Sequence, residues 1–318
     1  MKNILILGGT GFIGRHVCEK LARLQVRVSV PTRRYDNARS IIPLPLVTVL
    51  EGDIHDEATL TRLVAGHDAL VNLVGELHGS EAQLNRAHAE LPQKLARACA
   101  AAGVSRVVHL SAVGAGMEAP SRYLRSKARG ETAIRESGLA ATILRPSVVF
   151  GDGDSFINMF AKLQRAFAVL PLACTDAKFQ PVWVEDLADA VIACLKSDDT
   201  IGRTYEICGP DVFTLKELVQ LAGQYAGVNE GRGRTIIALP ESLGRLQAWV
   251  MELAPGKPLM SRDNLASMQV DNVASSDMPG LAALGIEASA LQAVVPRYLG
   301  SRGPRSSLDG MRRTAGRY

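Results

Sequence analysis

The most constraining feature of this sequence is a buried-strand pattern that runs directly into a glycine-rich turn and then into a helix pattern. Residues 4–7 form a continuous apolar run, as expected for a strand covered on both faces. Residues 8–14 read G-G-T-G-F-I-G, and residues 16–24 then show helical spacing of apolar side chains. Glycines in such a unit permit a tight turn, close approach of backbone to a pyrophosphate, and close packing of helix on strand. The unit predicts a dinucleotide site, with contacts from Gly8, Thr10, Gly11, Phe12, Ile13 and Gly14.

The residues after the second predicted strand indicate which dinucleotide is bound. That strand, residues 26–30, ends at the sequence P-T-R-R, which places Arg33 and Arg34 beyond it. A site selective for NAD(H) has a carboxylate near this point for the ribose 2′-hydroxyl. Two guanidinium groups instead suit a 2′-phosphate through bidentate hydrogen bonds. We predict NADP(H), with Arg33 the stronger candidate; the alternative is that both arginines are solvated at the strand end.

Strand and helix patterns alternate over the first 150 residues. Further strands are predicted at 47–50, 69–74, 106–110 and 141–144, with a helix over 82–102 that Gly103 ends. The alternation predicts an α/β protein with a Rossmann fold, a doubly wound parallel sheet with ligands at the carboxyl ends of its strands. At those ends, the residues expected to contact the nucleotide are Asp53, Ile54, Leu73, Val74 and Gly75. Asp53 could reach the adenine amino group, while Asp56 is expected to cap the next helix.

The pattern loosens after residue 150. We predict a NAD(P)-binding Rossmann domain over 1–150, a mixed region over 151–300 that returns partly to the sheet and partly forms a smaller substrate lobe, and a flexible basic tail over 301–318. A helix is expected to open at 183–187 with Glu185 or Asp186 at its N-terminus. A strand at 205–208 and a capping box from Thr214 to Glu217 follow.

One apolar stretch in the mixed region has two interpretations. Between residues 246 and 260, Trp249, Val250, Met251 and Leu253 stand beside basic residues. Packing within the core or lobe is the first expectation, because prolines keep any helix here short. The alternative is an interfacial helix that touches a membrane or a quinone tail.

Charge and composition exclude several classes of protein. The net charge of +4 is accounted for by the tail, which holds five arginines and one aspartate, so the remainder is neutral and nucleic acid is not an expected partner. Apolar runs such as 166–175 are too short to span a membrane. The six histidines show no metal-ligand spacing, and five cysteines form no C-x-x-C pair. The chain opens on a strand pattern rather than a signal or transit segment, so we expect a cytoplasmic location, with peripheral contact at the inner face of a membrane as an alternative.

A serine, a tyrosine and a lysine are the candidate catalytic residues. Ser111 follows the fifth strand, and Tyr123 and Lys127 lie one helical turn apart. An ammonium beside the phenol is expected to lower the pKa of Tyr123 from about 10. Tyr123 could then exchange a proton with a carbonyl or alcohol oxygen held by Ser111 while hydride moves at a nicotinamide. The alternative is that Lys127 only binds ribose hydroxyls and Tyr123 only packs against the ring.

These motifs together resemble the short-chain dehydrogenase/reductase superfamily, and within it one atypical branch. The segments that carry the narrower resemblance are 111–115 (SAVGA), 123–131 (YLRSKARGE), 142–151 (TILRPSVVFG), 154–158 (DSFIN), 180–190 (QPVWVEDLADA) and 205–210 (YEICGP). The branch contains the nucleotide-binding accessory subunit of mitochondrial complex I and its bacterial relatives. The resemblance implies NADPH bound through Gly8, Gly11, Gly14 and Arg33, with Pro146 near the nicotinamide.

The resemblance leaves two function classes open. Some relatives are linked to quinone biosynthesis, which implies a reductase of a carbonyl or quinone-related, small apolar substrate. The complex I subunit instead holds NADPH structurally, which implies a binding or assembly protein with respiratory-complex contacts.

Overall fold

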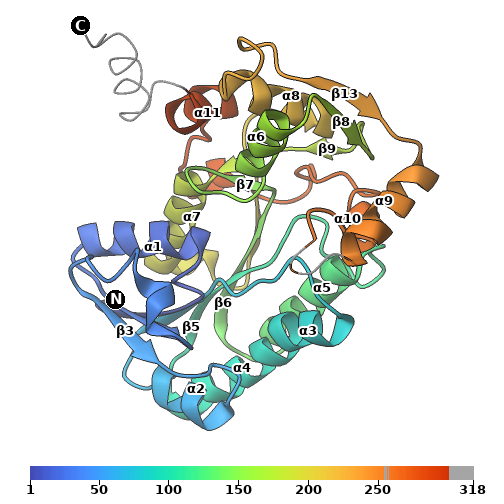
Figure 1. Ribbon diagram of the computed structural model, residues 1–318. Coiled ribbons are helices and arrows are strands. Elements are labelled where there is room, and N and C mark those ends of the chain that lie inside the picture. The colour runs from blue at the N-terminus through green and yellow to red at the C-terminus, as the bar shows by residue number, and fades with distance from the viewer. Residues whose placement is uncertain (254–255, 257, 301–318) are drawn as a thin grey trace, which may run out of the picture.

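A seven-stranded parallel sheet forms the centre of the molecule (Figure 1), in a computed structural model that describes residues 1–253, 256 and 258–300. Its strand order is β11-β6-β5-β4-β1-β2-β3. The strands are β1 Asn3–Leu7, β2 Arg27–Thr32, β3 Val47–Glu51, β4 Ala69–Asn72, β5 Arg106–Leu110, β6 Ala140–Pro146 and β11 Thr204–Ile207. Strand order reverses between β1 and β4, which creates the crevice where doubly wound sheets bind ligands. The predicted Rossmann-type fold is confirmed.

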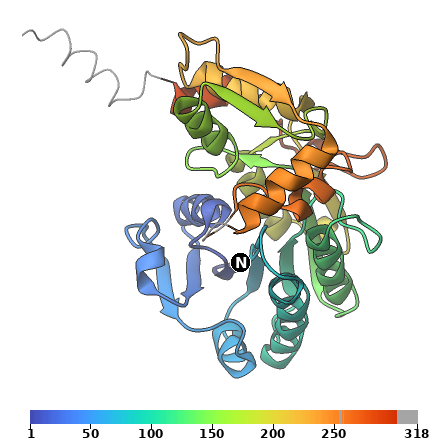
Figure 2. The same cartoon turned by 45° about the vertical axis from the view of Figure 1, so that its right-hand side comes forward.

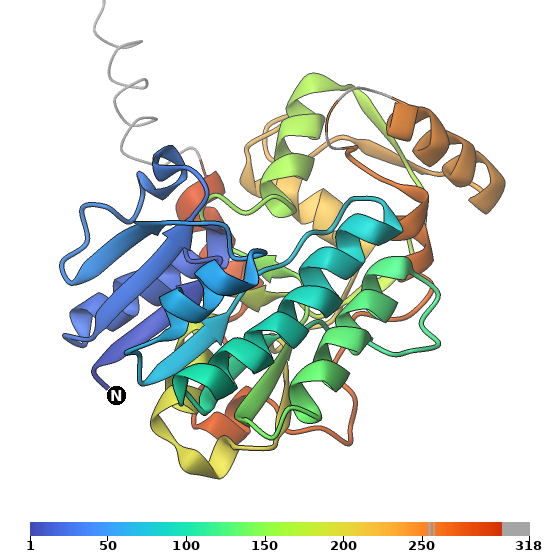
Figure 3. The same ribbon diagram turned by 90° about the horizontal axis from the view of Figure 1, so that it is seen from below.

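Helices cover both faces of the sheet because side chains alternate along each strand. In β1, Ile4 and Ile6 face one helical layer, and Leu5 and Leu7 face the other. The first layer is α1 Phe12–Arg23 and α7 Val184–Lys196; the second is α2 Glu57–Val64, α4 Leu91–Ala102 and α5 Arg122–Arg135. In the second layer α4 and α5 lie side by side (Figure 3).

The helix predicted over 82–102 is present but interrupted. It consists of α3 Glu81–Asn85, the π-helical turn η2 Arg86–Glu90, and α4, and Gly103 ends it in the left-handed conformation with a φ of 71°. Asp56 caps α2 as expected, since its carboxylate accepts the Thr59 N–H at 2.9 Å. π-Helical turns are rare and occur frequently at functional sites.

A smaller unit, here called the lobe, stands over the carboxyl ends of the strands (Figure 2). Its elements are β7 Val149–Phe150, α6 Ile157–Ala166, β8 Val169–Leu172, β9 Lys178–Phe179, β10 Val182–Trp183, β12 Phe213–Thr214, α8 Leu215–Tyr225, β13 Thr235–Ala238, α9 Glu241–Leu253, α10 Arg262–Ser267 and α11 Leu291–Leu299. The short 3₁₀ turns η1 Tyr35–Ala38, η3 Asp198–Thr200 and η4 Leu281–Leu284 belong to the sheet-bearing part, called the body. The lobe has an apolar core of its own, centred on α6, α8 and α11.

Two helix starts in this region can be compared with their predictions. Thr214 and Glu217 form the expected capping box at the start of α8. At α7, however, Glu185 and Asp186 lie in the first turn without capping it. Glu185 pairs with His16 and Lys20 of α1, and Asp186 accepts the Ser289 N–H at 2.7 Å. These carboxylates therefore lie in the first turn of α7, as expected, and bind other segments to it.

The expectation that the apolar residues of this stretch pack in a core is wrong for Trp249, Val250 and Leu253, whereas Met251 is partly buried. Helix α9 buries its small residues, Gly244 and Ala248. A Cβ added at Gly244 would lie 2.5 Å from the Cβ of Ala173, so the helix approaches its neighbour too closely for larger side chains on that face. The large side chains turn outward: Leu243, Leu246, Trp249, Val250 and Leu253 are 46–66% exposed.

Two earlier expectations concern the ends of the chain and the membrane. The basic tail at 301–318 lies outside the described residues. Within the described part, no helix combines the length and apolar character that crossing a bilayer requires.

Candidate functional site

The glycine turn between β1 and α1 is a close backbone contact that side chains would obstruct. Gly8 has a φ of 81°, and its carbonyl accepts the Gly11 N–H at 3.0 Å. A Cβ at Gly14 would lie 2.3 Å from the Gly8 oxygen, so only glycine lets α1 pack this closely. No side chain of the residues that the structure describes caps the start of α1 at Gly11. The first-turn amides, those of Phe12 and Ile13 among them, are therefore left for an anion. Helix start and glycine cradle fit a dinucleotide pyrophosphate.

Arginines follow the carboxyl end of β2, while β3 ends at Glu51 and is followed by Asp53. Arg33 and Arg34 directly follow β2, and both are exposed. The pKa of His55 is lowered, first by burial and then by the charges of Arg86, Lys94 and Arg33. Asp53 accepts the His55 N–H at 3.0 Å and lies 4.0 Å from the Arg86 guanidinium, while Ile54 packs on the core beneath the second helical layer. The donors at this end of the crevice match the chemistry of a phosphate.

Lys127 and Ser111 lie at the ends of β4 and β5. The buried Lys127 ammonium donates to the carbonyls of Leu110, at 3.1 Å, and Val74, at 3.5 Å. A Cβ added at Gly75 would lie 3.2 Å from the Lys127 Nζ. Burial lowers the pKa of Lys127 to about 8. Ser111 is 3% exposed and its Oγ has no hydrogen-bond partner among the described residues, so this hydroxyl is available to a ligand.

Tyr123 lies one turn before Lys127 on α5. Burial raises the pKa of Tyr123 to about 12. The expectation that Lys127 lowers this pKa is wrong for the structure, because the Lys127 ammonium is bonded to backbone carbonyls and desolvation of the phenolate dominates. Tyr123 is therefore protonated at neutral pH and suited to donate a proton.

His88 is a site residue that the sequence analysis missed. It lies on the π-helical turn, 2% exposed, and its ring meets the Tyr123 ring edge-on at 5.6 Å. Its Nε2 accepts the Glu76 N–H at 2.9 Å, so Nδ1 carries the proton and donates to Ser126 Oγ at 2.8 Å. Ser126 Oγ in turn donates to the Tyr123 carbonyl at 2.7 Å. A histidine on the apolar side of a helix pattern gave no signal of this role.

The remaining predicted contacts lie at neighbouring strand ends. Leu73 and Val74 follow β4, and the Leu73 N–H donates to the Leu7 carbonyl at 2.9 Å. Pro146 ends β6, and its carbonyl accepts the Val113 N–H at 3.0 Å. The next residue, Ser147, donates to Asn272 Oδ1 at 2.6 Å, which ties this strand end to the lobe.

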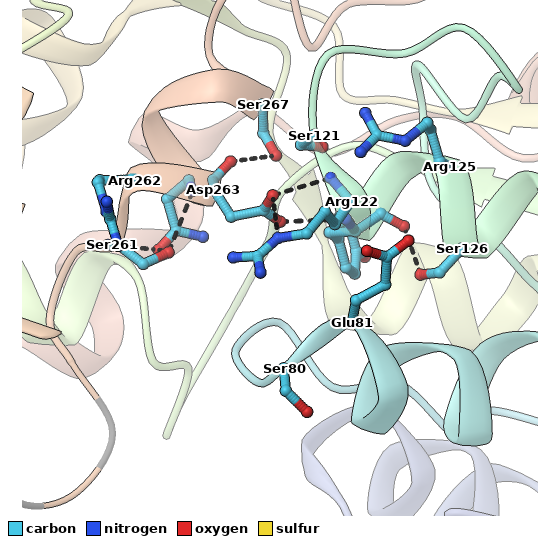
Figure 4. A network of polar contacts seen from close by, with 12 residues as sticks. Ser80, Glu81, Ser121, Arg122, Arg125, Ser126, Ser261, Arg262, Asp263 and Ser267 are labelled. Carbon is cyan, nitrogen blue, oxygen red and sulfur yellow. Dashed lines mark hydrogen bonds and ion pairs between the residues drawn. The ribbon is translucent and has the colours of Figure 1, made fainter.

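A lobe carboxylate reaches the start of α5 (Figure 4). Asp263 of α10 accepts the N–H of Arg122 at 2.8 Å and the N–H of Tyr123 at 3.1 Å. Its Oδ1 also lies 3.3 Å from the Arg122 Nε. Ser121 caps the same helix by accepting the Leu124 N–H at 3.1 Å. The helix that carries Tyr123 and Lys127 is thus held at its start by both the body and the lobe.

Comparison with known proteins agrees with this geometry. A family model described as the NAD dependent epimerase/dehydratase family matches residues 4–208. A protein named NADH dehydrogenase [ubiquinone] 1 alpha subcomplex subunit 9, mitochondrial, from Mus musculus is 32% identical over 297 residues, which cover 90% of this chain and 77% of that protein.

A ceramide reductase from Caulobacter vibrioides is 30% identical over 191 residues, which cover 60% of each chain. The solved structure of DesIV, a dTDP-glucose 4,6-dehydratase from Streptomyces venezuelae with NAD and TYD bound, superposes with a TM-score of 0.73 at 21% identity, covering 96% of this chain and 97% of that one. These matches confirm the resemblance indicated by the motifs between residues 111 and 210.

Proposed function

Because the chain belongs to the NAD dependent epimerase/dehydratase family, we propose that it binds NADP(H) and reduces a carbonyl or quinone-related, largely apolar substrate. The observations that carry this proposal lie at the ends of β4 and β5. The buried Ser111 Oγ has no hydrogen-bond partner in the described part of the chain, the Lys127 ammonium is held by the carbonyls of Leu110 and Val74, and the protonated Tyr123 lies one turn before Lys127 on α5. Such a set can hold a carbonyl oxygen and deliver a proton to it.

The glycine turn and the arginines after β2 would hold the cofactor. Gly8, Gly11 and Gly14 leave space for the pyrophosphate at the start of α1, and Arg33 would form bidentate hydrogen bonds to the 2′-phosphate. The same family includes NAD-binding proteins, so the preference for the 2′-phosphate rests on Arg33 and Arg34.

The chemistry proposed for the site is reduction of C=O to an alcohol. When bound, NADPH would supply the hydride that the carbonyl carbon accepts. Tyr123 donates its phenolic proton to the oxygen, and Ser111 holds that oxygen by a hydrogen bond. Lys127, at the ends of β4 and β5, would bind ribose hydroxyls of the cofactor.

A lobe cavity of about 630 Å³ would take the apolar part of the substrate. Its apolar lining includes Ala173, Leu239, Leu265 and Met268, and the paired side chains of Arg245 and Glu241 also reach it. A ceramide reductase among the relatives supports a carbonyl compound with a long apolar part.

Replacing Tyr123 by phenylalanine tests the mechanism. The Tyr123→Phe variant keeps the ring contact with His88 but loses the proton, so kcat should fall about 10²- to 10⁴-fold. Affinity for NADPH should stay the same, as measured by fluorescence titration. Tyr35→Phe, at an exposed tyrosine, is the matched control. Unchanged turnover in Tyr123→Phe would rule out this acid.

A second candidate is a non-catalytic binding protein that keeps NADPH as a structural ligand and joins a larger assembly. The observation that favours it is the exposed apolar face of α9, formed by Leu243, Leu246, Trp249, Val250 and Leu253. Relatives named as subunits of a mitochondrial NADH dehydrogenase agree with it. Such a face suits a partner subunit or the surface of a membrane, which would make the protein peripheral to the inner face of a membrane rather than freely cytoplasmic.

The dissociation rate of NADPH separates the two candidates. Release within about a second would permit ordinary turnover of roughly 1–10³ per second. Retention for hours would favour the structural ligand. Flotation with phospholipid vesicles, compared between the wild type and Trp249→Ser, tests whether the α9 face binds a membrane.

A further inference from the structure

The contact between α10 and α5 joins two parts of the chain that are far apart in sequence. Asp263 lies 141 positions after Arg122, yet its carboxylate accepts the first two N–H groups of α5. These N–H groups have no partner within their own helix. Ser121 already accepts the third. The lobe therefore supplies the acceptor for the two N–H groups that Ser121 does not bind.

The environment of Asp263 favours a charged, well-oriented carboxylate. Its side chain is only 10% exposed, and it faces the positive end of the α5 dipole and the Arg122 guanidinium. A carboxylate with two oxygens can accept both N–H groups at once, whereas a carboxamide offers one acceptor oxygen. The contact is therefore specific in both charge and shape.

The position of α10 is itself fixed by the lobe. Ser261 and Asn264 form a capping box at its start, and Arg262 pairs with Glu252 of α9 at 2.9 Å. Arg262, Leu265 and Ala266 of α10 also line the 630 Å³ cavity. One short helix thus borders the proposed substrate cavity and holds the start of α5.

We propose that Asp263 is a positioning residue for Tyr123, through which the placement of the lobe sets the position of the first turn of α5. The consequence for Tyr123 chemistry rests on the proposed function, whereas the mechanical tie between α10 and α5 does not. The lobe would then contribute to the reaction without touching the reacting atoms.

Hydrogen exchange at single amides tests the tie without any substrate. In Asp263→Asn the Arg122 or Tyr123 amide should exchange roughly tenfold faster, because one hydrogen bond and the charge are lost. The Leu124 amide, held by Ser121, should not change. Asp211→Asn, at an exposed loop position, is the matched control, since it removes one carboxylate and leaves Asp263 and the contacts of α10 in place. Equal exchange at Arg122 and Tyr123 in Asp263→Asn and wild type would overturn the tie.

Steady-state kinetics test the positioning role. We expect Asp263→Asn to lower kcat roughly tenfold while the Kd of NADPH stays within about twofold. Unchanged kcat, with exchange altered, would overturn the role in positioning Tyr123. Absence of turnover in the wild type would instead remove the proposed function, and the exchange result would still decide whether the lobe holds α5.

A second variant removes the donor, rather than the acceptor, of one hydrogen bond between α5 and Asp263. Arg122 is the first residue of α5, where proline is well tolerated. Ser121 before it has a ψ of 146°, the extended conformation that a following proline requires. Arg122→Pro removes one N–H that Asp263 accepts and keeps the helix, so a several-fold fall in kcat is expected even if Asp263→Asn does not fold. A folded Arg122→Pro variant with wild-type kcat would contradict the proposal.

Discussion

The body and the lobe differ in how the hydrogen bonds of their buried backbone groups are formed. In the body, seven parallel strands pair with one another and helices cover both faces. In the lobe, the sheets have two strands each, and β7, β9, β10 and β12 are two residues long. In the lobe, single buried side chains take the place of hydrogen bonds between strands. The Gln164 Oε1 accepts the Arg234 N–H at 2.7 Å, and the Gln164 amide donates to the Val219 carbonyl. Asp154 similarly accepts the N–H groups of Gly151, Phe156 and Asn158.

The two units also differ in how their structure is specified by the sequence. The body follows from periodicity and glycine placement, which recur in any chain with this architecture. The lobe follows from individual side-chain contacts between distant residues. Four experiments examine that contrast, from the largest expected effect to the smallest.

The glycine turn should be one of the least tolerant points of the body. In Gly14→Ala the added Cβ would lie 2.3 Å from the Gly8 oxygen and 2.5 Å from the Gly9 Cα, both backbone atoms that cannot rotate away. We expect a loss of about 3 kcal/mol in the free energy of unfolding and no measurable NADPH binding. In Gly116→Ala, the control, the nearest atom is 3.9 Å away. Urea unfolding and fluorescence titration would measure both effects, and normal cofactor binding by Gly14→Ala would contradict the assigned cradle.

Acid should weaken the body before the lobe. All six histidines lie within the first 109 residues, and burial, followed by the charges of Lys127 and His109, lowers the pKa of His88 to about 2. Between the unfolded value of about 6.5 and this value, only the unfolded chain binds the proton, so stability falls as pH falls. In that range, each such histidine lowers the free energy of unfolding by about 1.4 kcal/mol for each pH unit of acidification.

In the His88→Gln variant, the free energy of unfolding should fall less steeply between pH 6.5 and 4.5, by the contribution of one histidine. Urea unfolding at each pH measures this. Hydrogen exchange at pH 5 should rise in β5 before it rises in α8. Simultaneous loss of protection in both regions would erase the contrast between body and lobe.

Cofactor selection should depend on one exposed residue of the body. Arg33→Ala should lower the preference for NADPH over NADH roughly tenfold, through loss of a charge-assisted bidentate contact. Arg39→Ala is the control, since Arg39 is also exposed in this region but pairs with Asp36 at 2.8 Å. The ratio of dissociation constants for the two nucleotides measures the effect, and an unchanged ratio in Arg33→Ala would point to NAD(H) or to Arg34.

The outer face of α9 should contribute least to folding. Trp249 and Leu253 are 46% and 66% exposed, so Trp249→Ser and Leu253→Ser should change the free energy of unfolding by less than about 0.5 kcal/mol. Leu215→Ser, at a fully buried position of the lobe core, should cost several times more. A large loss in Trp249→Ser would mean that α9 is packed in solution, against the lobe or a second molecule.

Much of the body and part of the site could be predicted from the sequence. The glycine spacing at 8–14 and the strand ends at Gly75, Ser111 and Pro146 lie where the patterns placed them, because strand period and turn chemistry are local properties. The placement of Tyr123 and Lys127 one turn apart on α5 followed from helical spacing. The pKa of Tyr123 did not follow, because burial by surrounding elements is not visible in the spacing of two residues.

The contacts that pass between distant segments could not be predicted. The π-helical turn that brings His88 to Tyr123 has no signature in an alternating pattern. Asp263 and Asn272 look like ordinary loop and helix-start residues until the lobe is folded. The outward orientation of the large side chains of α9 depends on the close approach of Gly244 to Ala173, the residue that follows β8.

The path of the chain has a consequence for biosynthesis. After β6 the chain enters the lobe, returns to the body for α7 and β11, re-enters the lobe for α8 to α10, packs 281–288 on the body, and ends in the lobe with α11. Neither core is complete until nearly all of the described chain has been synthesised. A ribosome-bound intermediate should therefore stay open to proteases and chaperones until α11 emerges, and no single cut can release either unit as an independent fragment.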